Sequence, residues 1–282
     1  LSPERVMSYM QKGIRWFHMR KEDFAYYVGF NIDLAQAAHS QKSIECGKKI
    51  RLTMHVTETL ISQLTQGGLQ REQLEDASNV VMNAVELISM NISTLKLLES
   101  LEVSGTLPSH SIAVAIWSCL IARQVAWAGQ STFFKLAVSA LFHDVGQKEL
   151  PDDFSDKQRF ELSKQDRKIL ESHTLRGRDI LQSVPGMPED AAIVALQHHE
   201  LMHGGGYPYS LKYHQIHPFA RLISVADNFC EMIKAEGNRA IDYKAMFALF
   251  SQNNRDYDPV FMNALRELIM HQAPEKESGE TR

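Results

Sequence analysis

The stretch Leu141-Phe142-His143-Asp144-Val145-Gly146 joins an apolar run to an adjacent histidine and aspartate. Later in the chain two histidines are neighbours, and single residues of the same types lie before, between and after the two pairs. The five groups are 25 to 33 residues apart and consist of His110, His143-Asp144, His173, His198-His199 and Asp227. This separation is about one helical hairpin, so successive helices of one bundle can direct the side chains inward. The pattern therefore predicts a mainly α fold, a helical bundle built around the five groups.

The residue types of the five groups indicate a metal site. Imidazole and carboxylate without thiolate suit iron, manganese or zinc and do not suit soft Cu(I). Seven side chains are too many for one ion and fit two ions that share a bridging carboxylate. Two ions about 3.5–4 Å apart form the usual clamp for in-line attack on a phosphoryl group. The pattern thus favours phosphoester hydrolysis, and the sequence offers no Ser/His/Asp arrangement that would favour a covalent nucleophile.

The residues around these groups resemble a known family. The stretch Leu141–Gly146, followed by Leu150-Pro151, resembles the HD motif of the HD superfamily of metal-dependent phosphohydrolases. The run His198-His199-Glu200 and the loop Gly204-Gly205-Gly206-Tyr207-Pro208 are similar to the HHE and GYP signatures of the HD-GYP branch. The resemblance covers about residues 100–235, with landmarks around His110, His173 and Asp227 in the family's order. Residues 1–100 show no such resemblance.

The resemblance implies an all-helical fold that holds two metal ions, with iron first and manganese as the alternative. It implies hydrolysis of cyclic di-GMP to a linear dinucleotide or GMP through a metal-bridging hydroxide. It also implies how the ligands divide between the ions. One ion takes His110, His143, Asp144 and Asp227, and the other takes His173, His198 and His199, with Asp144 as the bridge.

The resemblance further assigns roles around the metal ions. Gly206 and Tyr207 of the GYP loop are expected to contact substrate, and the same loop serves family members as a surface for a diguanylate-cyclase-type protein. Asp144, with Gln147 and Lys148 beside it, is the expected catalytic group.

The chain departs from the family pattern next to the HD motif. The family has Lys where this chain has Gln147, and the neighbouring Lys148 is rotated by roughly 100° if the segment is helical. An amide gives a phosphate no charge, and charge-assisted bonds are about twice as strong as neutral ones. We therefore expect an unconventional member with a slower or altered reaction.

Three further departures lie elsewhere in the motifs. Leu201 and His203 stand where the family has Arg and Asp, and His203 is either an additional ligand or a loop histidine. The segment after Asp227 lacks the family's substrate-binding Arg, a role that either Lys234 or Arg239 could take. Thr106 stands where some members have a Glu for a third metal, so two ions are expected.

Composition excludes several other classes of protein. The 282 residues include 30 Lys and Arg against 34 Asp and Glu, a net charge of −4, so we expect neither a nucleic-acid polymer nor a membrane surface as partner. Three widely spaced cysteines do not form a disulfide framework and favour the cytoplasm. The apolar run 112–122 is too short to span a membrane and predicts a buried helix.

Composition shifts suggest a domain boundary near residue 100. Residues 1–100 are expected to form a smaller N-terminal regulatory domain, 101–273 the HD-GYP metal phosphodiesterase-like domain, and 274–282 a charged flexible tail. Within the first part, the aromatic runs 15–19 and 24–30 suggest two short strands, and helices are expected over 48–66 and 72–102. The apolar stripe of the second helix either pairs with itself in a homodimer or packs on the metal domain.

Two other functions remain open at this stage. One is a signalling module with little or no turnover that keeps its metal and binds a cyclic dinucleotide or a protein partner through the GYP loop. The altered residues Gln147 and Leu201 favour it, whereas the complete ligand set favours the enzyme. The other is a general HD phosphohydrolase acting on nucleotides, which has no need for His173, His198 and His199 together.

Overall fold

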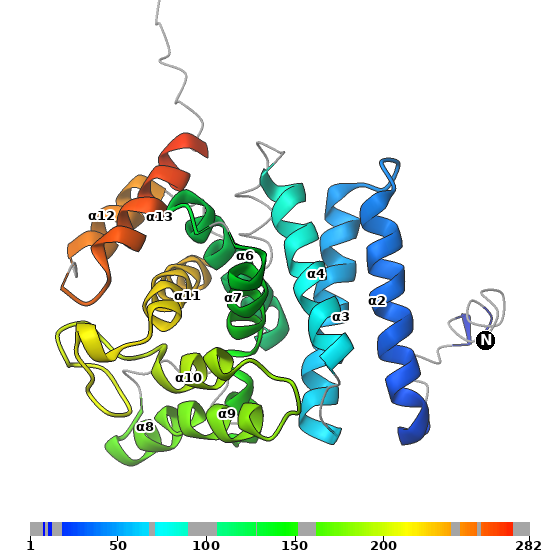
Figure 1. Cartoon of the computed structure of the whole chain (residues 1–282), viewed down its shortest axis with the longest axis horizontal. Coiled ribbons are helices and arrows are strands. Elements are labelled where there is room, and N and C mark those ends of the chain that lie inside the picture. Colours follow the sequence, from blue (N-terminus) through cyan, green and yellow to red (C-terminus); the bar gives the residue numbers. More distant parts are fainter. Residues whose placement is uncertain are drawn as a thin grey trace, which may run out of the picture.

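The computed structural model describes residues 8, 11–12, 19–67, 71–89, 106–127, 129–151, 162–237, 243–252 and 255–272. Helices joined by turns and loops make up this part of the chain (Figure 1). Within it there is no β-strand, only an isolated bridge between His203 and Lys212. The expected mainly α fold is confirmed.

Three helices form an N-terminal layer at one side of the molecule (Figure 1). They are α2 (Phe24–Ser40), α3 (Cys46–Gly67) and α4 (Arg71–Ser89), and α2 packs on both of the others. The helix expected over 48–66 is confirmed by α3. The proposed boundary near residue 100 falls outside the described residues and stays a prediction, as does the tail.

The remaining helices build the part of the bundle that carries the metal-ligand groups. Helices α6 and α7 lie next to the N-terminal layer, and α11 packs on α6 from the other side (Figure 1). The helices are α6 (Leu107–Gln124), α7 (Gln130–Phe142), α8 (Lys164–Glu171), α9 (His173–Gln182), α10 (Glu189–Gln197), α11 (Pro218–Glu236), α12 (Tyr243–Gln252) and α13 (Pro259–Gln272).

The strand expected over residues 24–30 is wrong, because this aromatic run lies in α2. Val28, Ile32 and Ala35 are buried at helical spacing and pack in the core with α3 and α4. The β-preference of aromatic residues is weak and depends on packing, so contacts along one helical face override it. Directly before α2, Lys21–Asp23 form a short 3-10 helix. Of the other run, 15–19, only Met19 is among the described residues, and it belongs to no helix or strand.

Helix α4 corresponds to the helix expected over 72–102 as far as residue 89. It decides whether the apolar stripe of that part pairs with itself or packs on the metal domain. Leu74, Ala77, Val81 and Val85 are fully buried, and α4 packs against both α6 and α7. The apolar stripe is therefore used within the chain and is not left open for self-pairing. Residues 90–102 of the expected helix lie outside the described residues.

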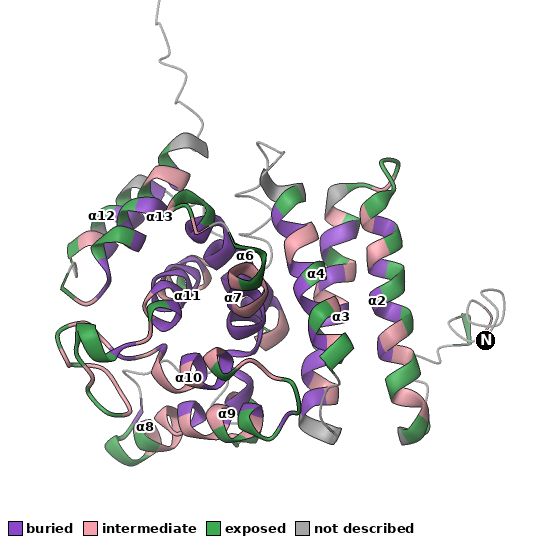
Figure 2. Cartoon of the chain, in the orientation of Figure 1, coloured by how far each residue is buried: buried purple, intermediate pink, exposed green. Residues whose placement is uncertain are grey.

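Helix α6 is the centre of the hydrophobic core. Every residue from 109 to 122 is buried, and Figure 2 shows buried residues concentrated on α6, α7 and α11. Trp117 of α6 packs edge-on against Phe229 of α11, with ring centroids 5.2 Å apart. The run 112–122 is thus a buried helix, as expected. No helix of the described residues is long and apolar enough to cross a membrane.

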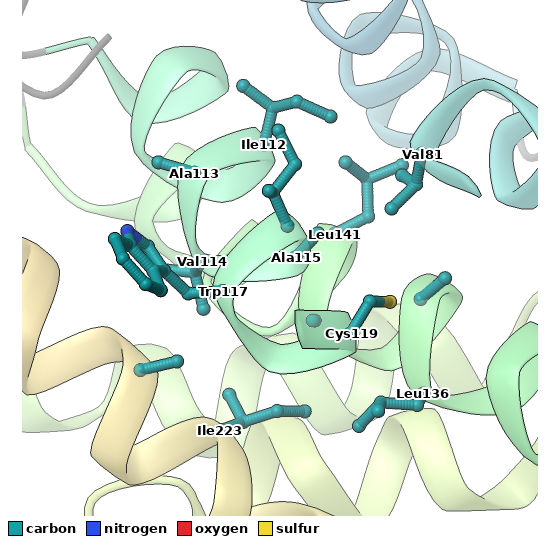
Figure 3. Close-up of a cluster of buried hydrophobic side chains, with 14 of the residues drawn as sticks. Val81, Ile112, Ala113, Val114, Ala115, Trp117, Cys119, Leu136, Leu141 and Ile223 are labelled. Atoms are coloured by element: carbon teal, nitrogen blue, oxygen red, sulfur yellow. The ribbon is translucent and has the colours of Figure 1, made fainter. Parts of the chain in front are cut away.

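The contact between α4 and α7 predicts a stability effect. Val81 of α4 points toward Leu141 of α7, two residues before His143 (Figure 3). Val81→Ala removes two buried methyl groups and should lower the free energy of unfolding by about 2 kcal/mol. The measurement is chemical denaturation followed by circular dichroism. Val260→Ala, at a position that is 57% exposed, is the control and should change stability by less than about 0.5 kcal/mol. Equal effects would contradict the assignment of Val81 to the core.

Candidate metal centre

The seven predicted ligands come together from five helical segments. His110 lies in the first turn of α6, and His143 with Asp144 directly follows the end of α7. His173 begins α9, His198 and His199 follow α10, and Asp227 lies in the middle of α11. All are buried except His199, whose side chain is 29% exposed. Each helix therefore supplies its ligand from an end or a face that meets the others inside the bundle.

The ligand atoms form overlapping groups in which each atom lies within 4.8 Å of the others. One group holds His110, His143 and Asp144, and a second holds Asp144, His173, His198 and His199. A third joins His143, His198 and Asp227. Asp144 belongs to both of the first two groups, so its carboxylate lies between them, in the arrangement that the resemblance implied for two ions.

The two oxygens of Asp144 face different groups. Oδ1 is 3.2 Å from His173 Nε2 and 3.4 Å from His198 Nε2. Oδ2 is 3.5 Å from His143 Nε2 and 4.0 Å from His110 Nε2. One carboxylate can therefore offer an oxygen to each of two cations.

Asp227 contacts histidines of both ligand groups. Its Oδ1 is 3.0 Å from His110 Nε2 and 3.8 Å from His143 Nε2, whereas Oδ2 is 3.9 Å from His199 Nδ1.

Backbone carbonyls orient three of the histidines. The Nδ1 atoms of His143, His173 and His198 donate hydrogen bonds to the carbonyls of Ala140, Leu170 and Ala195 at 2.7, 2.7 and 3.0 Å. Because Nδ1 carries the proton, Nε2 presents a lone pair to the centre of the cluster. Such a hydrogen bond on the second ring nitrogen is the usual way in which proteins fix a metal-binding histidine.

The spacing of these atoms fits cations better than it fits hydrogen bonds among the side chains. Within the part of the chain that the structure describes, His143 Nε2 and Asp144 Oδ1 are buried and have no hydrogen-bond partner, and His173 Nε2 and His198 Nε2 face each other at 3.4 Å. Ligands about 2.1 Å from a shared ion lie roughly 3.0–3.4 Å from one another. The buried clusters of histidine and aspartate could therefore hold metal ions.

Electrostatics prepares the carboxylates for this role. Burial by itself would raise the pKa of Asp144, but His143, His173 and His198 hold it well below its usual range. In the same way His110 and His143 outweigh burial and keep the pKa of Asp227 low. Both aspartates are therefore ionised at neutral pH.

The pKa values of the histidines shift in two different directions. Burial lowers the pKa of His198 and, together with the neighbouring His198, holds the pKa of His199 well below its usual range. Burial also disfavours the charged form of His143, but Asp144 and Asp227 outweigh it and raise the pKa of that histidine. His198 and His199 are thus already in the neutral form that ligation requires, whereas a cation would compete with a proton at His143.

Gly146 lets the HD motif approach α9 closely. A Cβ atom at this position would collide with the carbonyl of His173 and with the backbone nitrogen of Gly177. Both collisions involve backbone, which cannot move aside as a flexible side chain can. The glycine of the motif therefore sets the distance between Asp144 and His173.

This contact predicts that Gly146→Ala separates the two ligand groups. The added methyl group should push α9 away from the HD motif, lower stability by about 2 kcal/mol or more and reduce the metal bound per chain. Metal analysis and thermal unfolding on the same sample would measure both effects. Gly29→Ala is the control, because a Cβ there meets nothing within 4 Å. Full metal content in Gly146→Ala would contradict this role.

Gln147 and Lys148 lie in different surroundings. The amide of Gln147 donates a hydrogen bond to Asp144 Oδ2, whereas Lys148 is exposed. The residue that replaces the family's lysine thus contacts the shared carboxylate itself.

Lys234 and Glu231 lie beyond Asp227 on α11, and the second of these was missed in the sequence. Lys234 Nζ bonds Glu231 Oε1 at 3.3 Å, and Glu231 Oε1 is 3.7 Å from His110 Nδ1. Glu231 therefore places a carboxylate beside the first ligand group. Its position four residues after Asp227, on the same face of a helix, was the available signal.

The GYP loop packs over the second ligand group. The Tyr207 ring stacks on His199 with centroids 4.7 Å apart and meets the edge of His173 at 6.3 Å. A Cβ at Gly206 would collide with the backbone of residues 199–201. Only glycine therefore lets the loop lie this close to the histidine pair.

Glu200 holds the far side of the same loop. Its buried carboxylate accepts hydrogen bonds from the backbone N–H groups of Tyr209 and Leu211 at 2.7 and 2.8 Å. His203 lies outside the clusters of possible ligands and pairs with Asp256 at 3.1 Å, so the structure places it as a loop histidine. Thr106 caps the N-terminus of α6 by accepting a hydrogen bond from the Ser109 backbone N–H.

A sequence profile described as HD domain matches residues 82–260, more than half of the chain. The chain belongs to the HD domain family. The family recognised in its motifs is therefore confirmed. Within the family, this HD domain is similar to the cyclic di-GMP phosphodiesterase response regulator RpfG of Xanthomonas campestris, with 29% identity over 150 residues, 52% of this chain and 39% of that protein.

Two further relatives extend the comparison. The 3'3'-cGAMP-specific phosphodiesterase 3 of Vibrio cholerae is 29% identical over 163 residues, 57% of this chain and 35% of that protein. The matches thus span well under half the length of these curated relatives. The solved structure of Bd1817, described as an HDG"Y"P protein from Bdellovibrio bacteriovorus, aligns with a TM-score of 0.72 and 17% identity over 89% of this chain and 81% of that one. The last likeness establishes the fold alone.

Proposed function

We propose that this HD-domain protein is a metal-dependent phosphodiesterase that hydrolyses cyclic di-GMP to the linear dinucleotide or GMP. One observation carries the proposal. The two oxygens of the Asp144 carboxylate face two different groups of candidate ligands. A carboxylate with candidate ligands on both of its oxygens is the arrangement expected of a bridge between two ions. The relatives named as cyclic dinucleotide phosphodiesterases support the substrate class.

In this proposal the seven ligands keep the division that the resemblance implied. His110, His143, Asp144 and Asp227 hold one ion, and His173, His198 and His199 hold the other together with Asp144. Iron is the proposed metal and manganese the alternative, because imidazole and carboxylate suit both. Two such ions lower the pKa of water and neutralise charge on a phosphodiester in the transition state.

The chain's own residues orient the substrate in this proposal. Tyr207 lies against His199 and His173 of the second ligand group, and its ring and the backbone of Gly206 would contact a guanine or a phosphate bound there. Lys234 brings a cation to the side of His110 through its bond with Glu231. Lys148 is exposed near the HD motif and supplies a second cation there. Gln147 positions Asp144 and gives the phosphate no charge, so the reaction is expected to be slow.

Residues 1–100 have a regulatory role in this proposal. Helices α3 and α4 contact α6 and α7, the helices that carry His110 and lead into His143. A change in the N-terminal layer therefore reaches the ligands through two packed helices.

The cytoplasm is the proposed location, since the spacing of the cysteines favours a reducing compartment.

The test is metal content and hydrolysis on one preparation, purified without chelator or a metal-binding tag. We expect about two ions per chain, iron or manganese, and release of linear dinucleotide or GMP from cyclic di-GMP. Asp144→Asn should lower metal content to one ion or fewer and abolish turnover while far-ultraviolet circular dichroism stays unchanged. His203→Asn is the matched control and should retain both properties.

Three outcomes would change the proposal. Less than one ion per chain under all conditions contradicts the ligand assignment. Two ions with hydrolysis of 3'3'-cGAMP but not of cyclic di-GMP contradict the substrate and keep the enzyme class. Two ions with no turnover of either favour the second candidate below.

The second candidate is a metal-containing signalling module that binds a cyclic dinucleotide, or a diguanylate-cyclase-type protein through the GYP loop, with little turnover. Gln147 favours it, because an amide that donates its hydrogen bond to Asp144 stands where the family has a lysine and brings no cation to the phosphate.

Gln147→Lys tests whether this missing cation limits the rate. A lysine at this position reaches the ligand side of the motif and should raise hydrolysis severalfold, because charge-assisted bonds to phosphate are about twice as strong as neutral ones. Single-turnover kinetics with cyclic di-GMP would measure the change. Lys148→Gln serves as the comparison and should lower the rate, because it removes the second cation of the proposal. An unchanged rate in Gln147→Lys would show that another group supplies the charge.

A further inference from the structure

The GYP loop is the middle of a segment whose two ends meet. The backbone N–H of Tyr213 donates a hydrogen bond to the carbonyl of Met202 at 3.1 Å, and we call residues 202–213 the GYP segment. Within this segment Tyr207 stacks on His199. The contacts that hold the ends of the segment therefore also decide where the Tyr207 ring lies over the second ligand group.

The turn before α13 holds the first end of the GYP segment. The carbonyl of Asp256 accepts a hydrogen bond from the Met202 backbone N–H at 2.9 Å. His203 and Asp256 also pair at 3.1 Å, but the His203 side chain is half exposed, so screening by solvent leaves this pair little weight. Figure 1 shows the segment, in yellow, beside the start of α13. The first end is thus fixed to the C-terminal helices mainly through backbone.

Arg221 holds the second end through the ring of Tyr213. The guanidinium carbon of Arg221, in the first turn of α11, lies 4.4 Å from the centroid of the Tyr213 ring. A cation within about 6 Å of a ring centroid is attracted to the negative face of the ring, and more strongly so when it is removed from water. Only 15% of the Arg221 side chain is exposed, so this contact is of the stronger kind.

Asp258 fixes the guanidinium in turn. Its Oδ2 accepts a hydrogen bond from Arg221 Nη1 at 2.6 Å, and its Oδ1 accepts one from the Val260 backbone N–H at 3.0 Å, in the first turn of α13. Asp258 is buried. A buried carboxylate and a guanidinium at this distance depend on each other, because removal of either leaves a charge uncompensated. Arg221 is therefore held in one position between the start of α13 and Tyr213.

We propose that Arg221, Asp258 and Tyr213 are positioning residues for the aromatic ring of the GYP loop. Asp258 holds Arg221, Arg221 holds the ring of Tyr213, and the two ends of the GYP segment meet at Tyr213. The segment in turn carries Tyr207. The effect on substrate rests on the proposed function, whereas the effect on the segment itself requires neither metal nor turnover.

Loss of this anchor should weaken substrate binding and leave the ligand groups unchanged. A segment with a free end samples more positions, so Tyr207 contacts a guanine or phosphate for less of the time. Such a contact is made in the ground state and in the transition state alike, and its loss raises KM with little change in kcat. His143, His173 and His198 are oriented by backbone carbonyls outside the segment, so metal content should stay the same.

Hydrogen–deuterium exchange of the full chain tests the anchor. Tyr213→Ala removes the ring and should raise the exchange of backbone N–H groups in residues 202–213 by about tenfold, while exchange in residues 109–122 of α6 stays unchanged. Tyr213→Phe keeps the ring and should exchange as the wild type does. Arg266→Met is the matched control, because Arg266 forms an exposed ion pair with Glu267 within α13.

Two further variants test the ion pair behind the ring. Arg221→Met and Asp258→Asn should each raise exchange in the GYP segment at least as much as Tyr213→Ala does. Asp258→Asn keeps an oxygen for the backbone of α13 and removes the charge that fixes Arg221. Adding Tyr213→Ala to Arg221→Met should raise exchange no further, because Arg221 acts through that ring. If a variant of the buried pair fails to fold, Tyr213→Ala still decides, since Tyr213 is 38% exposed.

Substrate binding distinguishes positioning from a purely structural role. Tyr213→Ala should raise KM for cyclic di-GMP about tenfold and change kcat less than about twofold, at the metal content of the wild type. Tyr213→Phe should restore the KM of the wild type. If the wild type shows no turnover, the dissociation constant for cyclic di-GMP from isothermal titration calorimetry takes the place of KM.

Three results would overturn the inference. Unchanged exchange of the GYP segment in Tyr213→Ala shows that the ring does not hold it. An equal rise of exchange in α6 shows a loss of global stability in place of a loss of the anchor. Raised exchange in the segment with unchanged KM and dissociation constant shows that the anchor does not position a substrate contact. In contrast, a wild type that neither binds nor hydrolyses cyclic di-GMP contradicts the proposed function, and the exchange measurements then decide the anchor without it.

Discussion

The buried carboxylate of Asp144 is the constraint on which the rest of the structure depends. An ionised carboxylate inside a protein costs several kcal/mol unless partners compensate for its charge. Here three imidazoles surround it and hold its pKa well below the usual range. They come from α9, from the end of α7 and from the residues after α10, so the helices must meet at this point. The same arrangement that satisfies Asp144 also creates the two ligand groups that share it.

Close packing of the backbone keeps these groups at a fixed separation. Gly146 has no side chain, so the HD motif can lie directly against α9. Gly206 likewise lets the GYP loop lie directly against the histidine pair. Glu200 then holds the far side of that loop through two backbone N–H groups. Ligands and loop are thus placed by backbone contacts and buried hydrogen bonds, while flexible surface side chains contribute little to their positions.

The altered residues of the motifs change the charge around the ligands and leave the ligands themselves intact. Gln147 contacts the shared carboxylate without adding a positive charge, and Glu231 adds a negative one beside His110. Lys234 is bound to Glu231, which partly neutralises both. Compared with the family pattern, the surroundings of the first ligand group are therefore less positive. In the proposed phosphodiesterase this difference would weaken phosphate binding, whereas the seven candidate ligands are all present.

The sequence by itself determined the helical fold and the residues that gather at the candidate site. Their residue types and their spacing of about one hairpin are local properties that need no knowledge of how the helices pack. Seven residues of aromatic sequence were not enough to distinguish strand from helix in α2, because packing against α3 and α4 decides between them. Only the tertiary structure decided which oxygen of Asp144 faces which histidine, that Glu231 lies beside His110, and that the apolar stripe of α4 is buried against α6 and α7. These features depend on contacts between segments far apart in the chain, such as His110 and Asp227, which the order of residues along a helix does not specify.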